Sequence, residues 1–270
     1  EFRRVLFRSG HTGTLDPMAT GVLPVCIGKS TKIVDFLMDR KKGYACEMVL
    51  GSATDTQDCW GTITERSELP IPSEHEILKT IESFVGEIDQ IPPMYSALKV
   101  GGEKLVDLAR QGIVIERAPR RRTIYSIDSI VIEGASVRFK VICAKGTYIR
   151  TLCHDIGMAL GCYGHMTQLN RILSEPFNLD QAIEIEALNA DNVDQFIIDS
   201  ETALSWLPSV FVTAQSKLEM QINNGVKVDL SEFLRGESTE NLYKIYVNNH
   251  FRGIGELSPT GLYMKKILTD

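Results

Sequence analysis

The sequence predicts an α+β fold, in which a mixed, largely antiparallel sheet with flanking helices is followed by a small C-terminal β-rich region. Strand-like and amphipathic helical runs alternate along the first part of the chain without a strict βαβ rhythm, which disfavours a doubly wound parallel sheet. Two strand-like runs that meet at Gly134 form a hairpin pattern. From about residue 208, short strand-like runs alternate with turns, and 270 residues suffice for a large domain plus a small one.

Periodicity and turn residues place the individual elements. Ser73 and Glu76 form a capping box that starts a helix whose apolar face ends near Gly86. The paired prolines of residues 91–97 exclude a regular element there. In chain order the patterns predict a helix at 30–38, a strand at 44–50, helices at 73–86 and 103–111, strands at 124–133 and 136–143, a helix at 149–160, and strands at 210–212, 242–247, 253–257 and 261–267.

Composition indicates an ordinary globular protein, with 43% hydrophobic and 24% charged residues. The sequence contains no apolar run of about eighteen residues, so we expect no transmembrane helix. The six cysteines form no C-x-x-C pair and no zinc-ligand spacing, which favours reduced thiols in a cytoplasmic protein without a metal site. Nothing in the sequence supports a nucleotide cofactor, and we expect a monomer.

The net charge of −6 argues weakly against nucleic-acid binding, because phosphate contacts favour a basic surface. The positive charges are nevertheless clustered. The clusters are Arg40, Lys41 and Lys42; Arg117 with Arg120, Arg121 and Arg122; and Lys145 with Arg150. Two interpretations stay open: solvated surface charge, or local patches in which Lys41, Lys42 and Arg120 to Arg122 contact RNA phosphates.

One carboxylate, Asp16, lies in a loop at residues 10–24 and precedes a proline. The proline biases Asp16 toward extended backbone and away from helix. By composition alone, an aspartate before a proline is more often a turn former than a catalytic group. However, Gly10 and Gly13 let the backbone approach a ligand closely, and a single carboxylate on such a loop can serve as a nucleophile.

Two further segments carry residues suited to chemistry. Residues 145–150 lie at the expected start of a helix and hold Tyr148 and Arg150. A solvated arginine is the simpler interpretation; the functional one pairs Arg150 with Asp16 in a charge-assisted hydrogen bond that holds the carboxylate ionised and aimed. Tyr44 follows a basic turn; a strand tyrosine is more often a core residue, but this one could stack on a base extruded from RNA.

Three separated motifs occur in a fixed order: GHTGTLDPMATGVLP at 10–24, IPPMYSALK at 91–99 and KGTYIRTL at 145–152. In joint order and spacing they resemble the TruB-type tRNA pseudouridine synthases, from Gly10 to about residue 175, and the rest of the chain is compatible with that family. The resemblance implies a pseudouridine synthase catalytic domain at 10–205 and a small PUA-like RNA-binding domain at 208–270.

The resemblance also implies a reaction and roles for single residues. The enzyme would act without a cofactor and convert uridine 55 in the T-loop of tRNA to pseudouridine after flipping the base. Asp16 would be the nucleophile, Arg150 its partner, and Tyr44 the candidate that removes the proton at C5. The implied substrate contacts are His11, which stacks in the space that the uridine leaves; Tyr44 and Tyr148, which contact the uracil; and Leu169, which lines the pocket.

Two other functions stay open. One is an RNA-binding protein that grips tRNA with the same loops and has no catalysis; a placed carboxylate argues against it, since pure binding of phosphate-rich RNA needs no such group. The other is a guide-RNA-dependent relative that acts on ribosomal RNA. Such relatives usually carry longer basic termini, which argues against this interpretation.

The first nine residues, EFRRVLFRS, contain three arginines and no pattern that leads into the next segment. We predict that residues 1–9 are not native; a native, disordered N-terminus is the alternative interpretation. Members of the resembled family carry a further strand and a Lys-Pro segment before the first motif. Without that strand we expect unpaired groups at a sheet edge and a polypeptide that is unstable or poorly active.

Overall fold

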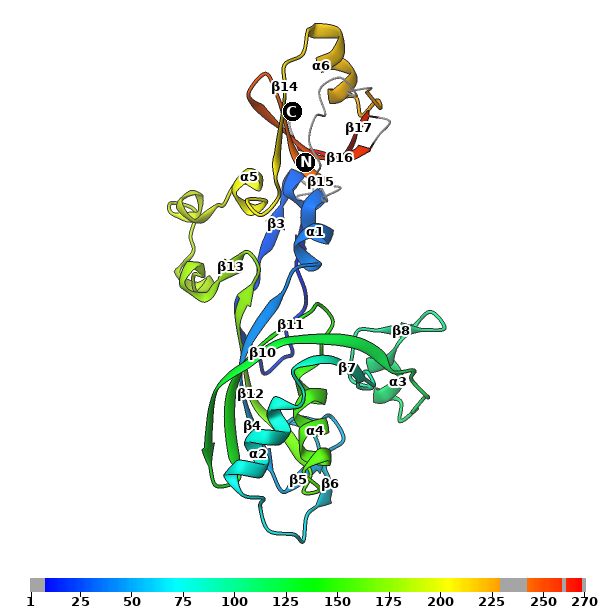
Figure 1. Cartoon of the computed structure of the whole chain (residues 1–270), viewed down its shortest axis with the longest axis vertical. Coiled ribbons are helices and arrows are strands. Elements are labelled where there is room, and N and C mark those ends of the chain that lie inside the picture. The colour runs from blue at the N-terminus through cyan, green and yellow to red at the C-terminus, as the bar shows by residue number, and fades with distance from the viewer. Residues whose placement is uncertain (1–7, 229–241, 259–260, 269–270) are drawn as a thin grey trace, which may run out of the picture. The chain divides into compact units, whose positions relative to one another are not determined.

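The structure, a computed structural model, describes residues 8–228, 242–258 and 261–268. The chain divides into two compact units. The larger unit comprises Gly13–Leu23 and Asp39–Ala182, and the smaller unit comprises Glu1–Thr12, Pro24–Met38 and Ile183–Asp270. Each unit contains both strands and helices (Figure 1), which confirms the predicted α+β class.

A mixed sheet organises the larger unit. Its strands follow the spatial order β13 (Phe177–Asn178), β12 (Gly164–Ser174), β4 (Lys42–Leu50), β11 (Ser136–Cys143), β10 (Arg120–Glu133) and β7 (Gly86–Gln90). All neighbours along this path pair antiparallel, and β2 (Thr20–Gly21) pairs parallel with β12. The predicted mixed, largely antiparallel sheet is therefore confirmed.

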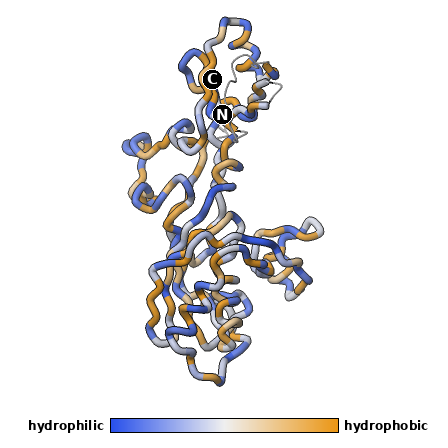
Figure 2. The backbone as a smooth tube through the Cα atoms, in the orientation of Figure 1, coloured by the Kyte–Doolittle hydropathy of each residue, from blue (hydrophilic) through white to orange (hydrophobic). Residues whose placement is uncertain are grey.

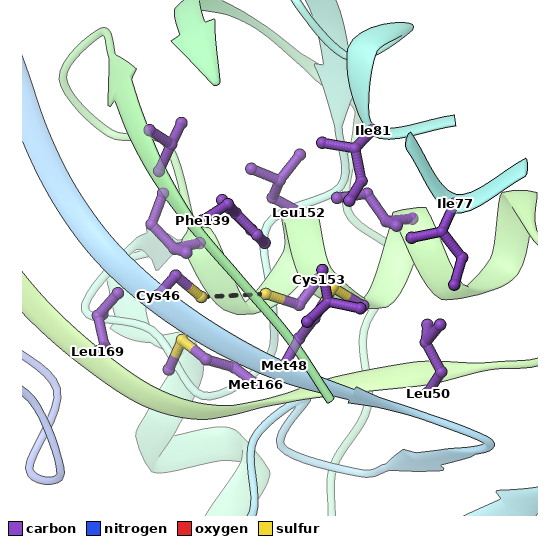
Figure 3. Packing of buried hydrophobic residues seen from close by; sticks show 14 of the residues in the cluster. Cys46, Met48, Leu50, Ile77, Ile81, Phe139, Leu152, Cys153, Met166 and Leu169 are labelled. Carbon is purple, nitrogen blue, oxygen red and sulfur yellow. Dashed lines mark hydrogen bonds between the residues drawn. The ribbon is translucent and has the colours of Figure 1, made fainter. Parts of the chain in front are cut away.

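Two helices, α2 (Glu74–Glu82) and α4 (Ile149–Ala159), pack against the apolar cluster of this sheet. Figure 3 shows Ile77 and Ile81 of α2, with Leu152 and Cys153 of α4, close to apolar side chains of the strands. The Sγ atoms of Cys153 and Cys46 lie 3.5 Å apart inside this cluster. Leu152 and Cys153 are fully buried, so the first turns of α4 are fixed against the sheet.

Smaller elements border the sheet. They are the hairpins β5 (Ser52–Thr54) with β6 (Ile63–Arg66) and β8 (Lys99–Val100) with β9 (Glu103–Lys104), the helix α3 (Leu105–Arg110) and the short helix η2 (Leu179–Gln181). Residues 91–97 contain no helix or strand, as the prolines predict. The capping box at Ser73 and Glu76 is present and starts α2.

The smaller unit has its own sheet, in the order β14 (Ser209–Val212), β15 (Leu242–Val247), β16 (His250–Ser258) and β17 (Gly261–Ile267). All four strands match predicted ones. The pair β14·β15 is parallel, and the other two pairs are antiparallel. Its remaining elements are the strand pair β1 (Ser9–His11) with β3 (Val25–Ile27), and the helices η1 (Gly28–Ile33), α1 (Val34–Met38), η3 (Ile185–Ala187), η4 (Val193–Phe196), α5 (Ser200–Ala203) and α6 (Ser216–Asn223).

Several elements differ from the prediction, and four of them bear on the predicted architecture. The strand β12 was not predicted, because polar residues interrupt its apolar pattern and two register irregularities break the alternation. The helix α2 ends at Glu82 rather than near Gly86, which instead begins β7 with a φ of 112°. The predicted helix at 30–38 is a 3₁₀ turn followed by a short α-helix, and α6 lies within the region predicted as β-rich.

Hydrophobic and hydrophilic residues alternate along the chain in both units (Figure 2). In the described part of the chain, none of the helices combines the length and the apolar character needed to cross a membrane.

The two compact units divide the chain at other positions than the domain border predicted at 205–208, which stays a prediction. Of the segment predicted to be non-native, residues 1–7 lie outside the described residues, while the Arg8 carbonyl accepts a hydrogen bond from the Gly28 amide at 2.8 Å.

Candidate active site

The loop that carries Asp16 is tied to strand β12 of the larger unit. Thr20 and Gly21 form β2 and pair with Asn170 and Arg171. The Val22 amide donates to the Arg171 carbonyl at 2.8 Å, and the Ala19 amide closes a turn onto the Asp16 carbonyl at 2.8 Å. The loop thus has a defined path, and the Asp16 side chain is 32% exposed, so a ligand in solvent can reach it.

The structure brings Asp16 and Arg150 together. The Arg150 Nε donates to Asp16 Oδ2 at 2.9 Å, and its Nη2 donates to Asp16 Oδ1 at 3.0 Å. This is the parallel two-bond geometry in which a guanidinium holds a carboxylate in one orientation. Only 5% of the Arg150 side chain is exposed, so the pair is little screened by water.

Arg150 is also held by groups that sequence reasoning missed. Its Nη1 donates to the Thr56 carbonyl at 3.0 Å, and its Nη2 donates to the Tyr95 carbonyl at 2.8 Å. The Asp58 carboxylate lies 3.7 Å from Nη1. Because a cation near a helix N-terminus opposes the helix dipole, these acceptors offset a cost that the position of Arg150 in α4 creates. Tyr95 lies in a motif that the sequence singled out, whereas no sequence pattern marked Thr56 or Asp58.

Tyr44 lies in β4 directly opposite Arg171 of β12. Burial, followed by the neighbouring Cys143, raises the pKa of Tyr44 to about 12, although the charge of Arg171 and its hydrogen bond to the Tyr44 side chain act in the opposite direction. Asp16 also contributes to this raised pKa. Tyr44 is therefore a half-buried phenol near the carboxylate, not the purely apolar core residue of the simpler interpretation.

The other predicted substrate contacts lie in different places. Tyr148 is half-buried and directly precedes α4; its backbone amide and carbonyl bond to the Gln90 side chain at 3.0 and 3.1 Å. Leu169 is 7% exposed and belongs to the apolar cluster of the sheet. His11 lies in β1 of the smaller unit.

The residues predicted to contact RNA phosphates differ in their exposure to solvent and in their present partners. Lys41 is exposed and its Nζ lies 4.4 Å from the centre of the Tyr125 ring, and Arg120 is exposed as well. Arg121 is exposed beside Glu87 and Asp89, at 3.5 and 3.7 Å, and Arg122 donates to the Gly146 and Arg121 carbonyls. Lys42 is only 6% exposed, and burial lowers its pKa to about 8; the structure does not present it on the surface, where a phosphate contact needs it.

Family models match most of the chain. Residues 3–149 match the family described as TruB family pseudouridylate synthase (N terminal domain). Residues 150–205 match the family described as tRNA pseudouridylate synthase B C-terminal domain.

Known proteins match over nearly the same length. A Clostridium acetobutylicum protein named tRNA pseudouridine synthase B is 48% identical over 261 residues, which is 96% of this chain and 89% of that protein. Its namesake from Clostridium kluyveri is 46% identical over 247 residues, covering 91% and 84%. Among solved structures, a chain of a Cbf5–Nop10–Gar1 complex is similar with a TM-score of 0.68 and 27% identity, covering 97% of this chain and 77% of that one.

Fold and site together define a pseudouridine synthase, an isomerase that acts on RNA. The chain belongs to the TruB family of pseudouridylate synthases. The resemblance stated from the three sequence motifs is thereby confirmed.

Proposed function

We propose that this enzyme converts uridine to pseudouridine at position 55 in the T-loop of tRNAs, with Asp16 as the nucleophile. Its relatives of 46–48% identity are named as tRNA pseudouridine synthases, which supports tRNA as the substrate class. The observation that carries the proposal is the two-bond pair between Asp16 and the buried Arg150. A carboxylate oriented by a guanidinium on a partly exposed loop suits attack on a nucleoside.

The reaction is an isomerisation and needs no oxidant or reductant. The N1–C1′ bond of the uridine breaks, the uracil turns, and a C5–C1′ bond forms; a proton leaves C5 and a proton is gained at N1. Asp16 attacks either C1′ or C6 of the base, and both routes return the carboxylate at the end. Because the uracil must leave the base stack first, aromatic side chains that receive it lower the cost of flipping.

The remaining residues take roles around that step. Tyr44 is the candidate for proton removal at C5, with Tyr148 beside it on the uracil. A pKa of about 12 keeps the Tyr44 hydroxyl protonated in the absence of RNA. Tyr44 can therefore remove the proton at C5 only when bound substrate has drawn away the hydroxyl proton. Leu169 lines the pocket, and His11 stacks in the space that the base vacates.

The exposed residues Lys41, Arg120 and Arg121 contact RNA phosphates, and residues 208–270 add a PUA-like RNA-binding surface. Arg122, which belongs to the same run of arginines, shares this role, whereas the buried Lys42 does not. We further propose that the enzyme works as a monomer in the cytoplasm without a small-molecule cofactor.

Conversion of a tRNA T-arm minihelix tests this function. The minihelix carries uridine tritiated at C5, and the full chain is incubated with it alone, without any guide RNA. We expect one tritium released per RNA, mapped to position 55, and no release from a matched minihelix with cytidine at that position. Release only after a guide RNA is added would favour the guide-dependent alternative, and binding without release would favour a non-catalytic tRNA-binding protein.

A further inference from the structure

Arg171 is a cation buried beneath the candidate active site. It lies in β12, is 2% exposed and is among the largest fully buried side chains of the described residues. Its Nε donates to the Val22 carbonyl at 2.6 Å, and its Nη2 donates to the Gly13 carbonyl at 3.1 Å. A buried guanidinium is costly unless its donors are used, so its placement here requires these acceptors.

The two carbonyls belong to opposite ends of the loop that carries Asp16. Gly13 precedes Asp16 and Val22 follows it, so one guanidinium joins both ends. The backbone of Arg171 holds the same loop, through its pairing with Gly21 and the bond from the Val22 amide. The loop can therefore shift little unless Arg171 releases it.

Arg171 also reaches the second candidate group. It is the register partner of Tyr44 across the β12·β4 pair, and its positive charge acts on the Tyr44 phenol. One guanidinium thus holds the loop of Asp16 and lies beside the residue that carries the second candidate group. Lysine could not replace it, because an ammonium on a flexible stem lacks the planar fork that serves several acceptors at fixed angles.

We propose that Arg171 is a positioning residue that holds the Asp16 loop and the Tyr44 hydroxyl in one arrangement, so that both groups act on the same flipped uridine. This inference rests on the proposed function of Asp16 and Tyr44. Arg171 acts through these two residues and takes no part in the bond changes. Its contribution belongs to the rate of the bound complex and not to the affinity for RNA.

The test compares Arg171→Lys with Arg138→Lys in the full chain. Arg138 lies in β11 of the same unit, is 49% exposed and pairs with Glu133 at the surface, which makes it a matched control. Single-turnover tritium release from the T-arm minihelix is measured over a range of enzyme concentrations. We expect Arg171→Lys to lower the maximal rate about thirtyfold while the half-saturating concentration changes less than about threefold. Arg138→Lys should change neither.

Coupling to Tyr44 separates positioning from a general structural defect. If Arg171 acts through Tyr44, the double variant Arg171→Lys/Tyr44→Phe should lose at least about fivefold less rate than the product of the two single losses. Losses that multiply, or a rate for Arg171→Lys equal to that of Arg138→Lys, would overturn the proposal. Should Arg171→Lys fail to fold, Arg171→Gln takes its place, because its amide can still donate to a carbonyl without burying a charge.

Asp16→Asn, measured in parallel, separates the two proposals. If Asp16→Asn keeps the full rate, the assignment of the nucleophile fails. The role of Arg171 is then decided by its coupling to Tyr44 alone: non-multiplying losses support it and multiplying losses contradict it.

Discussion

Two buried arginines contact the same loop through different groups. Arg150, at the start of α4, directs two donors at the partly exposed Asp16 carboxylate and two at the carbonyls of Thr56 and Tyr95. Arg171, in the middle of β12, directs its donors at the Gly13 and Val22 carbonyls and is the register partner of Tyr44. One arginine therefore orients the carboxylate that we propose as the nucleophile, and the other orients the backbone that carries it.

The two arginines therefore have different electrostatic roles. Arg150 orients the carboxylate of the proposed nucleophile, so its removal should affect the reaction first. The bonds of Arg171 satisfy backbone carbonyls, so their removal should affect geometry first. By contrast, the exposed Arg121 lies beside carboxylates in solvent, where ion pairs contribute little to stability.

Replacing Arg150 should have the largest effect on the reaction. Arg150→Met leaves Asp16 without its cation and two backbone carbonyls without donors. We expect at least about a thousandfold loss in the single-turnover rate. The free energy of unfolding should fall by about 2 kcal/mol, because the partly exposed Asp16 regains water while the carbonyls do not. Tritium release and urea denaturation measure the two losses.

Arg150→Lys is the matched control for charge without the planar fork. It should retain more activity than the methionine variant, since a positive charge stays near Asp16. Equal activity of Arg150→Met and the unaltered enzyme would contradict the role of the pair.

Removing the Tyr44 hydroxyl tests the proposed link between Arg171 and Tyr44. Tyr44→Phe deletes the candidate proton-removing group, but keeps the ring that receives the base. We expect about a hundredfold lower rate with a stability change within about 1 kcal/mol. Rates and melting temperatures are compared with Tyr44→Leu, which also removes the ring and should weaken RNA binding. A rate for Tyr44→Phe within twofold of the unaltered enzyme would remove the hydroxyl from the mechanism.

Displacing the loop from Arg171 tests the geometry directly. An added Cβ at Gly21 would lie 2.3 Å from the Arg171 carbonyl oxygen, at a φ of +102°. Gly21→Ala should therefore cost about 3 kcal/mol of unfolding free energy and slow the reaction with it. Gly134→Ala, at a φ of +62° with no atom within 4 Å of the added Cβ, should cost only about 1 kcal/mol. Equal costs in thermal melts would show that β12 does not confine the loop.

The smallest effect concerns Asp155, a half-buried carboxyl group on α4. Burial raises the pKa of Asp155 to about 6, above its ordinary value of 3.8. The stability linked to this raised pKa is fully present below the ordinary value and is lost as the pH rises through about 6. Asp155→Asn should therefore raise the melting temperature at pH about 7.5, with a gain that shrinks toward pH about 4. A gain in melting temperature that is independent of pH would contradict the assignment.

Much of the fold was predictable because its strands and helices follow simple periodic patterns. The alternation of β4, the hairpin β10·β11 and the capping box of α2 are local features. The strand β12 was not predictable, because a charged residue in a strand ordinarily faces solvent. Arg171 is instead buried, and the carbonyls that accept its hydrogen bonds come from distant parts of the chain. No local pattern carries that information.

The candidate site divides in the same way. Asp16, Tyr44 and Arg150 stood in or beside marked segments, so their residue types could be weighed from sequence. The contacts of Thr56, Asp58 and Tyr95 with Arg150 arise only when the loop between β5 and β6 and the loop after β7 meet at α4. The burial of Lys42 was likewise missed, because sequence places it in a run of exposed-looking charges.

The most direct measurement of the central claim is the single-turnover rate of Asp16→Asn on the T-arm minihelix, with RNA binding measured on the same preparation. Asparagine keeps the size of the side chain and one acceptor for Arg150, but it cannot act as a carboxylate nucleophile. We predict that binding stays within about threefold and that the rate falls by at least about ten-thousandfold. Full tritium release by a folded Asp16→Asn enzyme would contradict the account.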